Sequence, residues 1–467
     1  MSDAWAPWRV AALLLVGVVI AYSAVPGYGY VYEDYRALQA GPVGALALAP
    51  RGLSTWLWRI ADPRAAHLLS LALHLLAGCL TGLLGRRLGL SGQAAILAGG
   101  LLLLHPLAVE SVAYVSSRAE LLAAIGILLA CLCATGPWWV WPLIVPAMAL
   151  ALAGKESGIV GLGLVPLVWA YRWPRWWTWA LVAVGALAWL PLGLWRLGGD
   201  LTWLIHYDDA TASLGWQWWV LAQSTAVFRL AVLSVVSWLP VGHTIDFDYD
   251  AISRLSRVAA LVLVGLIPLV LWLHRARVPR LVLYACAACI VALIPRMVIQ
   301  TPRAYLSEHQ FYVPLIFVAI AAGACWQAWP PSTYYRWNSE RRVRTWVWLN
   351  RRELVAVILL LCLTWQTRTA VQVWASDLTL WRNASVLAPT KPRPAANYAV
   401  ALLVGGNREA GEAMLDYAAR IADDPHVTPW DRREALEMVA INRLELRDID
   451  ARAYLRQEAE LVAQRTP

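Results

Sequence analysis

The sequence predicts an all-α fold: a polytopic bundle of about eleven membrane-spanning helices and one re-entrant or interfacial helix, followed by a small C-terminal α-helical repeat domain. The 467 residues are 60% hydrophobic and only 15% charged, whereas soluble domains carry about 25% charged residues. The apolar residues occur in blocks of roughly 16 to 22, the length that a helix needs to cross the hydrocarbon layer. After Gln366 the chain becomes polar and keeps a helical periodicity.

The apolar blocks place the spans in order along the chain. The first, residues 8–26, follows a short N-terminus without a small-residue cleavage site, so we interpret it as a retained helix and not a signal peptide. The predicted spans are residues 8–26, 65–85, 93–105, 117–134, 138–153, 157–171, 176–196, 257–273, 281–295, 311–327 and 354–366. Residues 216–239 do not fit the alternation, because acidic stretches flank both ends; we expect this stretch to re-enter or to lie along the interface, with an extra span as the alternative.

The charges predict the orientation of the bundle. The formal charge of +9 does not indicate a nucleic-acid partner, because only Lys155 and Lys391 are lysines and most arginines form short clusters between apolar blocks. The clusters are at Arg86 and Arg87, at Arg172 and Arg175, at Arg275, Arg277 and Arg280, and from Arg336 to Arg352. The positive-inside rule makes these ends and the N-terminus cytoplasmic, and the C-terminal domain periplasmic or extracellular. The short loops, the lack of a disulfide pattern and the bias towards arginine predict a bacterial inner membrane.

The C-terminal domain is predicted to span residues 368–467, after a membrane domain of residues 1–367. Ala395, Tyr398, Ala399 and Leu402 repeat at three and four, and a second such run follows the Gly-Gly-Asn turn. Two amphipathic helices with small-residue contacts resemble a tetratricopeptide unit, and a weaker pair is predicted over residues 430–464.

Ionisable residues gather at the predicted outer ends of the spans. Glu33 and Asp34 follow the first span directly. The span before His105 is too short to cross a bilayer unaided, so the residues that follow it are expected near membrane depth inside a protein cavity, where ionisable groups usually line a polar site. These residues are His105, Glu110, Arg118 and Glu120.

Two further groups lie on the same predicted side. Lys155 and Glu156 interrupt two apolar runs, and "PRMVIQTPRAYLSEHQFYVP" carries Arg303, Glu308 and His309. A carboxylate pair, several cations and a histidine suit a reaction in which a carboxylate takes a proton from an acceptor while cations stabilise a departing phosphate. No GxGxxG, Walker or HExxH motif is present, so the donor is expected to arrive through the membrane and not as a nucleotide.

Each group also has a structural interpretation. Asp34 could cap a helix, Lys155 and Glu156 could form an ion pair at a helix break, and Arg118 could pair with Glu110 within one helical region. His67 and His74, seven residues apart, are more simply explained by packing. "HTIDFDYD" offers Asp246 and Asp248 as weak candidates for a divalent metal site. Cys286 and Cys289 lie in an apolar run and are expected to be buried free thiols.

These segments together resemble the TMTC-like membrane glycosyltransferases of the GT-C class, in order along nearly the whole chain. "HPLAVESVAYVSSRAELLA" is the most specific match; the others are Glu33-Asp34, "AAHLLSLALHLLAG", "GKESGI", "SEHQFYVP" and "DLTLWRNASVLAPTKPRPAANYAVALLVGGN". The resemblance implies a GT-C-like bundle that moves a sugar, with inversion, from a polyprenyl phosphate to an acceptor at the outer face. The pair here is Glu-Asp where many members have Asp-Asp or Asp-Glu, so which carboxylate acts stays open.

By this resemblance Asp34, with Glu33, is the catalytic base. Arg118, Lys155 and Arg303 would contact the donor phosphate. The pocket would be lined by His105, Glu110, Glu120, Glu156, Glu308 and His309. The expected acceptor is a protein hydroxyl, as in O-glycosylation by a mannosyltransferase-like enzyme, and a lipid or glycan acceptor is the alternative. A transporter or flippase would also be multispan, although we find no internal repeat across the spans.

Overall fold

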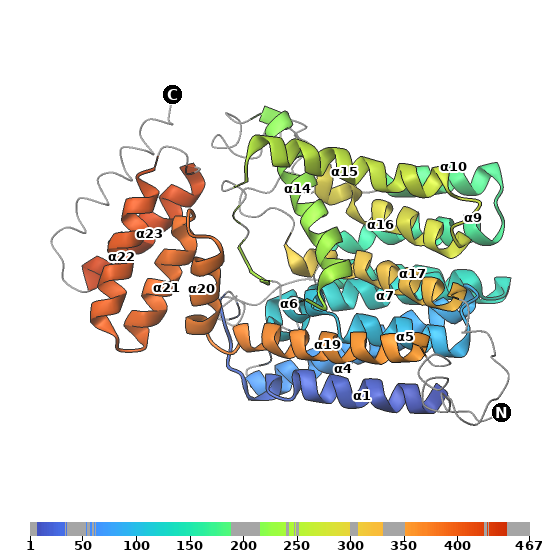
Figure 1. Ribbon diagram of the computed structural model, residues 1–467, viewed down its shortest axis with the longest axis horizontal. Coiled ribbons are helices and arrows are strands. Elements are labelled where there is room, and N and C mark those ends of the chain that lie inside the picture. The colour runs from blue at the N-terminus through green and yellow to red at the C-terminus, as the bar shows by residue number, and fades with distance from the viewer. Residues whose placement is uncertain are drawn as a thin grey trace, which may run out of the picture.

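The computed structural model shows an all-helical chain with no strand among the residues that it describes (Figure 1). The described residues are 7–32, 34, 53, 57, 60, 62–187, 215–239, 242–246, 248, 252–298, 307–329, 351–424, 427 and 429–445. Two predicted site residues, Glu33 and Arg303, lie outside this part of the chain.

The described part of the chain forms seventeen α-helices joined by turns and short 3-10 helices. In order they are α1 (Pro7–Tyr22), α4 (Pro63–Arg87), α5 (Gly92–Leu103), α6 (Val109–Ala113), α7 (Arg118–Thr135), α8 (Ile144–Gly154), α9 (Gly161–Arg172), α10 (Trp176–Ala186), α14 (Gly215–Val236), α15 (Arg254–Leu273), α16 (Arg280–Val298), α17 (Tyr312–Ala328), α19 (Arg351–Val373), α20 (Asp377–Leu387), α21 (Pro392–Val404), α22 (Arg408–Ala422) and α23 (Pro429–Glu445).

Six helical stretches in the described residues are long and apolar enough to cross a membrane, which is compatible with a multi-pass membrane protein. They are Val10–Gly27, Pro63–Arg87, Val115–Thr135, Arg254–Leu273, Glu308–Ala328 and Glu353–Val373. A seventh is present if Gly92–Leu103 and Pro106–Ala113, bent by 55° at His105, are one broken span. The predicted number of about eleven is therefore not confirmed. Some predicted spans are short or begin with a 3-10 helix, as at Trp138–Gly154, so apolar composition alone overstates their length.

Local signals place the ends of α4. Asp62 accepts hydrogen bonds from the backbone N–H groups of Arg64 and Ala65, and Pro63 occupies the first helical turn, where its missing N–H costs nothing. At the other end two arginines, Arg86 and Arg87, complement the negative end of the helix dipole. Gly89 then takes a φ of +106°, a conformation that glycine adopts without strain.

The bundle is held together by close helix contacts around α7, whose apolar length is almost wholly buried. A Cβ added at Gly126 would lie 2.4 Å from the Ala151 nitrogen of α8, and one added at Gly154 would lie 2.7 Å from the Ala123 nitrogen of α7. Only glycine allows the two backbones to approach this closely at both positions.

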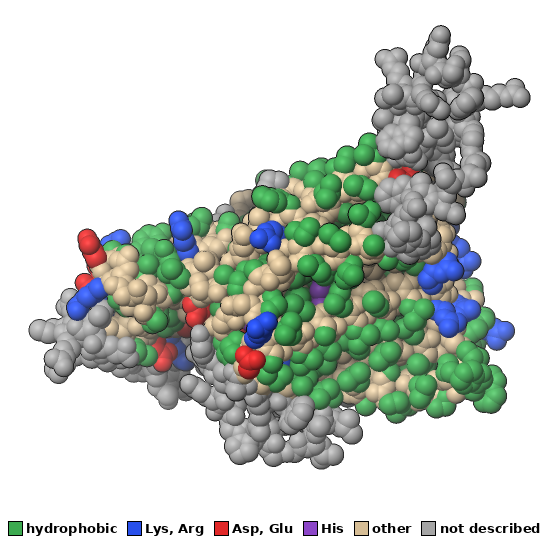
Figure 2. Space-filling view, turned by 90° about the horizontal axis from the view of Figure 1, so that it is seen from below, with side chains coloured by type: hydrophobic (Ala, Val, Ile, Leu, Met, Phe, Trp, Pro, Cys, Tyr) green, Lys and Arg blue, Asp and Glu red, His purple; other side chains and the backbone are tan. Residues whose placement is uncertain are grey.

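The two ends of the bundle differ in charge and in what they carry. α20 to α23 gather at one end in Figure 1, and the long helices point from there towards the other end. Figure 2 shows Lys and Arg side chains gathered at that other end of a largely apolar surface. The exposed arginines there lie at or just beyond the C-terminal ends of α4, α9 and α15 and at the start of α16: Arg86, Arg87, Arg172, Arg175, Arg275, Arg277 and Arg280. The broken helix at His105 lies at the opposite end, near α6.

α14 covers most of the stretch predicted to re-enter or to lie along the interface. It is one unbroken helix of 22 residues that packs against α15 and α16. In Figure 1 it runs steeply across the direction of α15. An unbroken helix does not form a re-entrant turn within the described residues, and its relation to a membrane stays a prediction.

The C-terminal helices have a small core of their own, formed mainly by alanines of α21, α22 and α23. Ser376 and Thr379 form a capping box at the start of α20, and Asn407 accepts a hydrogen bond from Ala410 N at the start of α22. The predicted boundary between residues 367 and 368 falls inside α19, which continues to Val373. The tetratricopeptide character of these helices stays a prediction.

Candidate functional site

The candidate site is built around the break at His105 and Pro106, where proline cannot continue the ladder of α5. His105 begins the next short helix: its Nδ1 accepts from Leu107 N at 3.2 Å, and its Nε2 lies 3.2 Å from Ser234 O of α14. Because Nδ1 accepts, the proton is on Nε2, which donates to Ser234. His105 therefore ties the break to α14.

Asp34 is 1% exposed and is held by the turn between α6 and α7. Its Oδ1 accepts from Ser116 N at 2.7 Å and Ser116 Oγ at 2.6 Å. Its Oδ2 accepts more weakly from Val31 N at 3.4 Å and Val115 N at 3.3 Å. Burial raises the pKa of Asp34 to about 6, against these hydrogen bonds, which lower it. The carboxyl group therefore titrates closer to neutral pH than an ordinary aspartate does.

Arg118, the first residue of α7, is fully buried and its nitrogens are engaged within the protein. Nε donates to Ser70 Oγ at 3.1 Å, Nη1 to Leu57 O at 3.2 Å and Nη2 to Ala66 O at 2.8 Å. These hydrogen bonds of Arg118 go to Ser70, Leu57 and Ala66 and not to Glu110, the partner that the sequence suggested. Arg118 instead fastens the start of α7 to α4, and Asp34 is the carboxylate whose charge favours the guanidinium.

Lys155 and Glu120 form a buried ion pair with a distance of 2.6 Å between Nζ and Oε1. Ser157 Oγ donates to the other carboxylate oxygen at 3.3 Å. Lys155 lies at the end of α8, so the pair fixes the break between α8 and α9 against the first turn of α7. Glu156, which precedes this serine, is partly exposed and begins the short 3-10 helix before α9.

Two carboxylate–imidazole pairs flank α6. Glu110 accepts from His309 Nδ1 at 2.7 Å and from His309 N at 2.9 Å. Glu308 accepts from His243 Nδ1 at 2.8 Å, from Arg229 Nη2 at 2.8 Å and from Thr244 N at 3.3 Å. Both pairs are charge-assisted, with buried carboxylates and partly exposed histidines, and they join α6, α14 and the turn before α17.

A small cavity lies between these pairs and the end of α19. Its lining includes Glu110, His243, Glu308 and Trp374, and its volume of about 10 Å³ leaves room for about one water molecule. The Nε2 atom of His243 is buried and has no hydrogen-bond partner among the described residues. The cavity is too small for a sugar ring.

Aromatic side chains connect this cavity to the neighbourhood of Asp34. Tyr114 stacks on Trp374 with ring centroids 5.3 Å apart, and Tyr32 lies 5.8 Å from Tyr114 and 5.2 Å from Trp381. Tyr32 has a φ of +54°, and its N–H donates to Asp377 Oδ1 at 2.8 Å. The strained backbone at Tyr32 is thus held by the first turn of α20, next to the segment that carries Asp34.

Asp246 and Asp248 bind the C-terminal helices. Asp246 lies 3.1 Å from Lys391 Nζ and 3.8 Å from Arg393 Nε, and Asp248 accepts from Thr390 Oγ1 at 2.7 Å. Burial alone would raise the pKa of Asp246, but the two cations hold it below its usual value. Burial would lower the pKa of Lys391, and the charge of Asp246 raises it instead.

The described residues contain no group of three or more His, Cys, Asp or Glu side chains arranged to hold a metal ion. Asp246 is paired with the cation of Lys391, and Asp248 accepts from the hydroxyl group of Thr390. These partners suit a structural contact and not the binding of a divalent cation. His67 and His74 are hydrogen-bonded, as their packing role predicts: His67 Nε2 lies 3.3 Å from Gly29 O, and His74 Nδ1 lies 2.7 Å from Tyr312 Oη.

The predicted site residues that the structure describes lie at one end of the bundle, but in separate contacts. Asp34 and Arg118 share one neighbourhood, Glu120 pairs with Lys155, and Glu110 pairs with His309. Sequence reasoning did not single out Arg229, His243 or Arg393. Arg229 had a visible signal, since it is the only charged residue in the apolar stretch 216–239. Lys391 and Arg393 lie in a stretch that contributes only to the family resemblance, which assigns no site role to them.

The chain matches no model of a protein family, no curated protein and no solved structure.

Proposed function

We propose that this protein is an inverting GT-C-type glycosyltransferase that moves a sugar from a polyprenyl phosphate to a hydroxyl group of an extracytoplasmic protein. The observation that carries the proposal is Asp34, a buried carboxyl group with a pKa of about 6 at one end of an apolar helical bundle. A base with such a pKa is largely ionised near neutral pH and still accepts a proton readily.

In the proposed reaction the acceptor oxygen attacks the anomeric carbon from the face opposite the phosphate. The new carbon–oxygen bond forms as the bond to the phosphate oxygen breaks. The hydroxyl proton goes to Asp34, and polyprenyl phosphate leaves as the anion. The proposal needs no nucleotide, in keeping with the absence of nucleotide-binding motifs.

Asp34 accepts two hydrogen bonds on each oxygen, so one must give way when a substrate hydroxyl arrives. The Ser116 hydroxyl is the donor that can rotate, whereas the three N–H donors belong to the backbone. We therefore place the acceptor hydroxyl where Ser116 Oγ now meets Asp34 Oδ1. Glu33, which neighbours Asp34 in the sequence, is the second proposed carboxylate.

The proposed phosphate contacts differ in how they would act. Arg118 donates from all three nitrogens to protein oxygens, so we assign to it a long-range charge effect beside Asp34. Lys155 and Arg303 remain the proposed direct contacts. A direct contact from Lys155 requires its ammonium group to bind the phosphate and the Glu120 carboxylate at the same time. Divalent metal is not needed for this scheme.

The proposed orientation in the membrane rests on the distribution of arginines. The arginine-bearing end is proposed to face the cytoplasm of a bacterium, and the end with Asp34 and α20 to α23 the periplasm. The C-terminal helices lie at the same end as Asp34 (Figure 1) and carry exposed charged side chains such as Arg408 and Glu412, which favours a protein acceptor. They are the proposed contact for that acceptor.

The test is mass spectrometry of intact envelope proteins and their glycopeptides from a host that lacks this gene. The host is complemented with wild type, Asp34→Asn or the control Asp62→Asn, which changes an exposed cap of α4. We expect a sugar-sized mass with wild type and the control but not with Asp34→Asn at equal expression. If wild type restores no mass on any protein, the protein-acceptor proposal fails; if Asp34→Asn restores it, the base assignment fails.

A further inference from the structure

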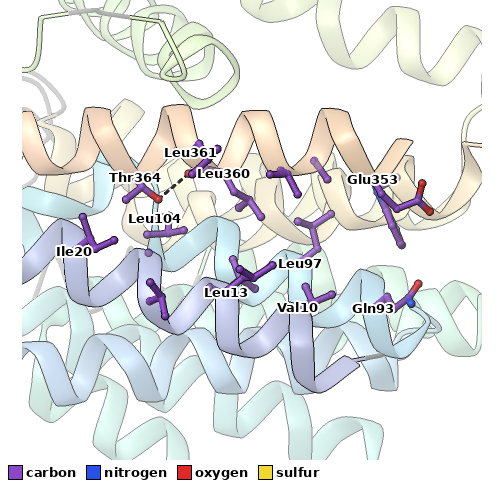
Figure 3. A pocket seen from close by; sticks show the side chains of 16 residues that line it. Val10, Leu13, Ile20, Gln93, Leu97, Leu104, Glu353, Leu360, Leu361 and Thr364 are labelled. Carbon is purple, nitrogen blue, oxygen red and sulfur yellow. Dashed lines mark hydrogen bonds between the residues drawn. The ribbon is translucent and has the colours of Figure 1, made fainter. Parts of the chain in front are cut away.

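An apolar groove runs along the side of the bundle between α1, α5 and α19, and one of its ends reaches Leu104, beside the break at His105 (Figure 3). Its volume is about 160 Å³. The polar residues of its lining are near the two ends: Gln93 and Glu353 at one end, and Thr364 at the other, where Thr364 Oγ1 donates to Leu360 O at 2.7 Å. The wall between the ends is therefore hydrocarbon.

The groove has a closed end and an open end. At the closed end, Arg368 of α19 donates to Ile20 O of α1 at 2.8 Å and to Ser23 Oγ at 3.2 Å. Gly17 allows the helices to meet there, since a Cβ at this position would lie 3.0 Å from Thr364 Oγ1. At the other end Val10, Gln93 and Glu353 surround the mouth (Figure 3). This is the end of the bundle that carries the exposed arginines.

The length of the groove matches that of one lipid chain lying partly in it. From Glu353 to Thr364 the helix rises about 16 Å, close to half of the roughly 30 Å hydrocarbon layer and so to the depth of one leaflet. The rim is open to the side, because Leu13, Val16 and Leu361 are exposed. A packed helix, about 10 Å across, does not fit this volume. A water-soluble ligand has no polar partners along the wall.

We propose that the groove binds one acyl chain of a glycerophospholipid from the leaflet at the arginine-bearing end. The chain lies between α1 and α19, and the headgroup remains at the mouth beside Gln93 and Glu353. The occupant is not the proposed sugar donor, because the phosphate of that donor must reach Asp34 at the opposite end of the bundle. The bound acyl chain takes the place of mobile lipid chains beside α1. It contacts both α1 and α19 and so stabilises their pairing.

The experiment uses the full-length protein in phosphatidylethanolamine vesicles that contain a trace of the same lipid with a photoactivatable group midway along one acyl chain. Peptide mapping after illumination locates the labelled residues. The test variant is Ala356→Phe, which fills the groove, and the matched control is Val355→Phe, which enlarges the neighbouring exposed side chain outside the lining. We expect label on Leu13, Val357 and Leu361 in wild type and control, reduced at least fivefold in Ala356→Phe.

Equal labelling of the three proteins would overturn the proposal, because it would indicate loosely bound surface lipid. Strong competition by added polyprenyl phosphate, with none by excess phosphatidylethanolamine, would also overturn it in favour of an isoprenoid site. A loss of label when more of the protein is added, at a constant ratio of photoactivatable lipid to protein, would assign the groove to a second copy of the chain. That result would contradict the proposal. Circular dichroism of Ala356→Phe in the same vesicles confirms that the variant is folded.

Discussion

Asp34 is the residue on which the proposed chemistry depends, and its surroundings make its ionisation sensitive to single substitutions. Its hydroxyl donor, Ser116, stabilises the carboxylate and lowers the pKa that burial has raised. The remaining donors are backbone N–H groups, which a change of the Ser116 side chain to alanine leaves in place. Ser116 therefore provides a way to change the pKa of Asp34 without altering the carboxyl group.

Ser116→Ala is expected to raise the pKa of Asp34 above about 6, because the carboxylate loses one hydrogen bond while its burial is unchanged. The acidic limb of the pH profile for sugar transfer should move to higher pH. Activity should fall below neutral pH and recover at higher pH. The measurement is kcat/KM for sugar transfer between pH 5 and 9, which reports the pKa of the free protein before the acceptor displaces the Ser116 hydroxyl. An unchanged acidic limb would contradict the role of Asp34 as the base.

Asp34 also makes the stability of the protein depend on pH. Its pKa is about 6 in the folded protein and 3.8 as the ordinary value, so the folded state binds more protons between these pH values. Stability therefore falls as pH rises through this window, by roughly 3 kcal/mol in total for this group.

Asp34→Asn removes this titration. The measurement is thermal unfolding of wild type and Asp34→Asn from pH 4 to pH 7. As pH rises, the wild type should lose stability relative to the variant. A constant difference would show that Asp34 has an ordinary pKa. The exposed Asp62→Asn provides the control, because that group lies outside the buried network.

At the scale of elements, buried ion pairs hold the helix breaks in place. The pair of Lys155 and Glu120 joins the break after α8 to α7, and both side chains are less than a tenth exposed. Removing one partner of such a pair leaves a buried charge without compensation, which typically costs about 3–5 kcal/mol.

Lys155→Met is expected to destabilise the fold by about that amount, and Lys155→Met with Glu120→Gln should recover most of the loss. The measurement is the midpoint of thermal unfolding of both variants in the same detergent. Equal destabilisation by the single and the double variant would show that the ion pair contributes little and that Lys155 is held by other contacts.

A second set of buried ion pairs lies in the loop that carries Asp246 and Asp248. It joins the bundle to the connection between α20 and α21. Asp246→Ala removes the carboxylate that pairs with the buried side chains of Lys391 and Arg393. We expect faster proteolytic cleavage near residues 388–392, while the proteolysis of α15 and α16 stays unchanged. Cleavage at the wild-type rate would show that the aromatic contacts of Arg393 with Tyr32 and Trp381 suffice.

The helices themselves could largely be predicted from local sequence. The apolar run predicted at residues 65–85 is α4, Pro63–Arg87, and the run predicted at 117–134 is α7, Arg118–Thr135. Asp62 and Pro63 mark the start of α4 in the sequence as clearly as in the structure. The number of spans could not be predicted, because composition does not show where a 3-10 turn or a bend interrupts an apolar run.

The side-chain partners of the candidate site could not be predicted. Glu110 meets His309 from 199 positions away, and Asp246 meets Lys391 from 145 positions away. Periodicity reports only the face of a helix on which a residue lies. It identified the ionisable residues at one end of the bundle, whereas the packing of distant helices decides which of them form pairs.

On the scale of the whole molecule, the arginines and the C-terminal helices define two different ends. A phosphatase that is active only outside the cytoplasm, fused after residue 445, should be active. The same reporter fused after Arg175, in the connection between α9 and α10, should be inactive. The opposite pattern would reverse the proposed orientation and place Asp34 on the cytoplasmic side.

The central claim is that Asp34 takes the proton while a polyprenyl phosphate leaves. It is tested most directly with the purified protein in vesicles made from lipids of a host that lacks the gene, together with that host's envelope proteins. The measurement is release of free polyprenyl phosphate from its sugar-linked form by liquid chromatography and mass spectrometry. We predict release with wild type and a rate at least about 100-fold lower with Asp34→Asn, the contribution expected of a general base. Release at the same rate by both proteins, or by neither, would contradict the account.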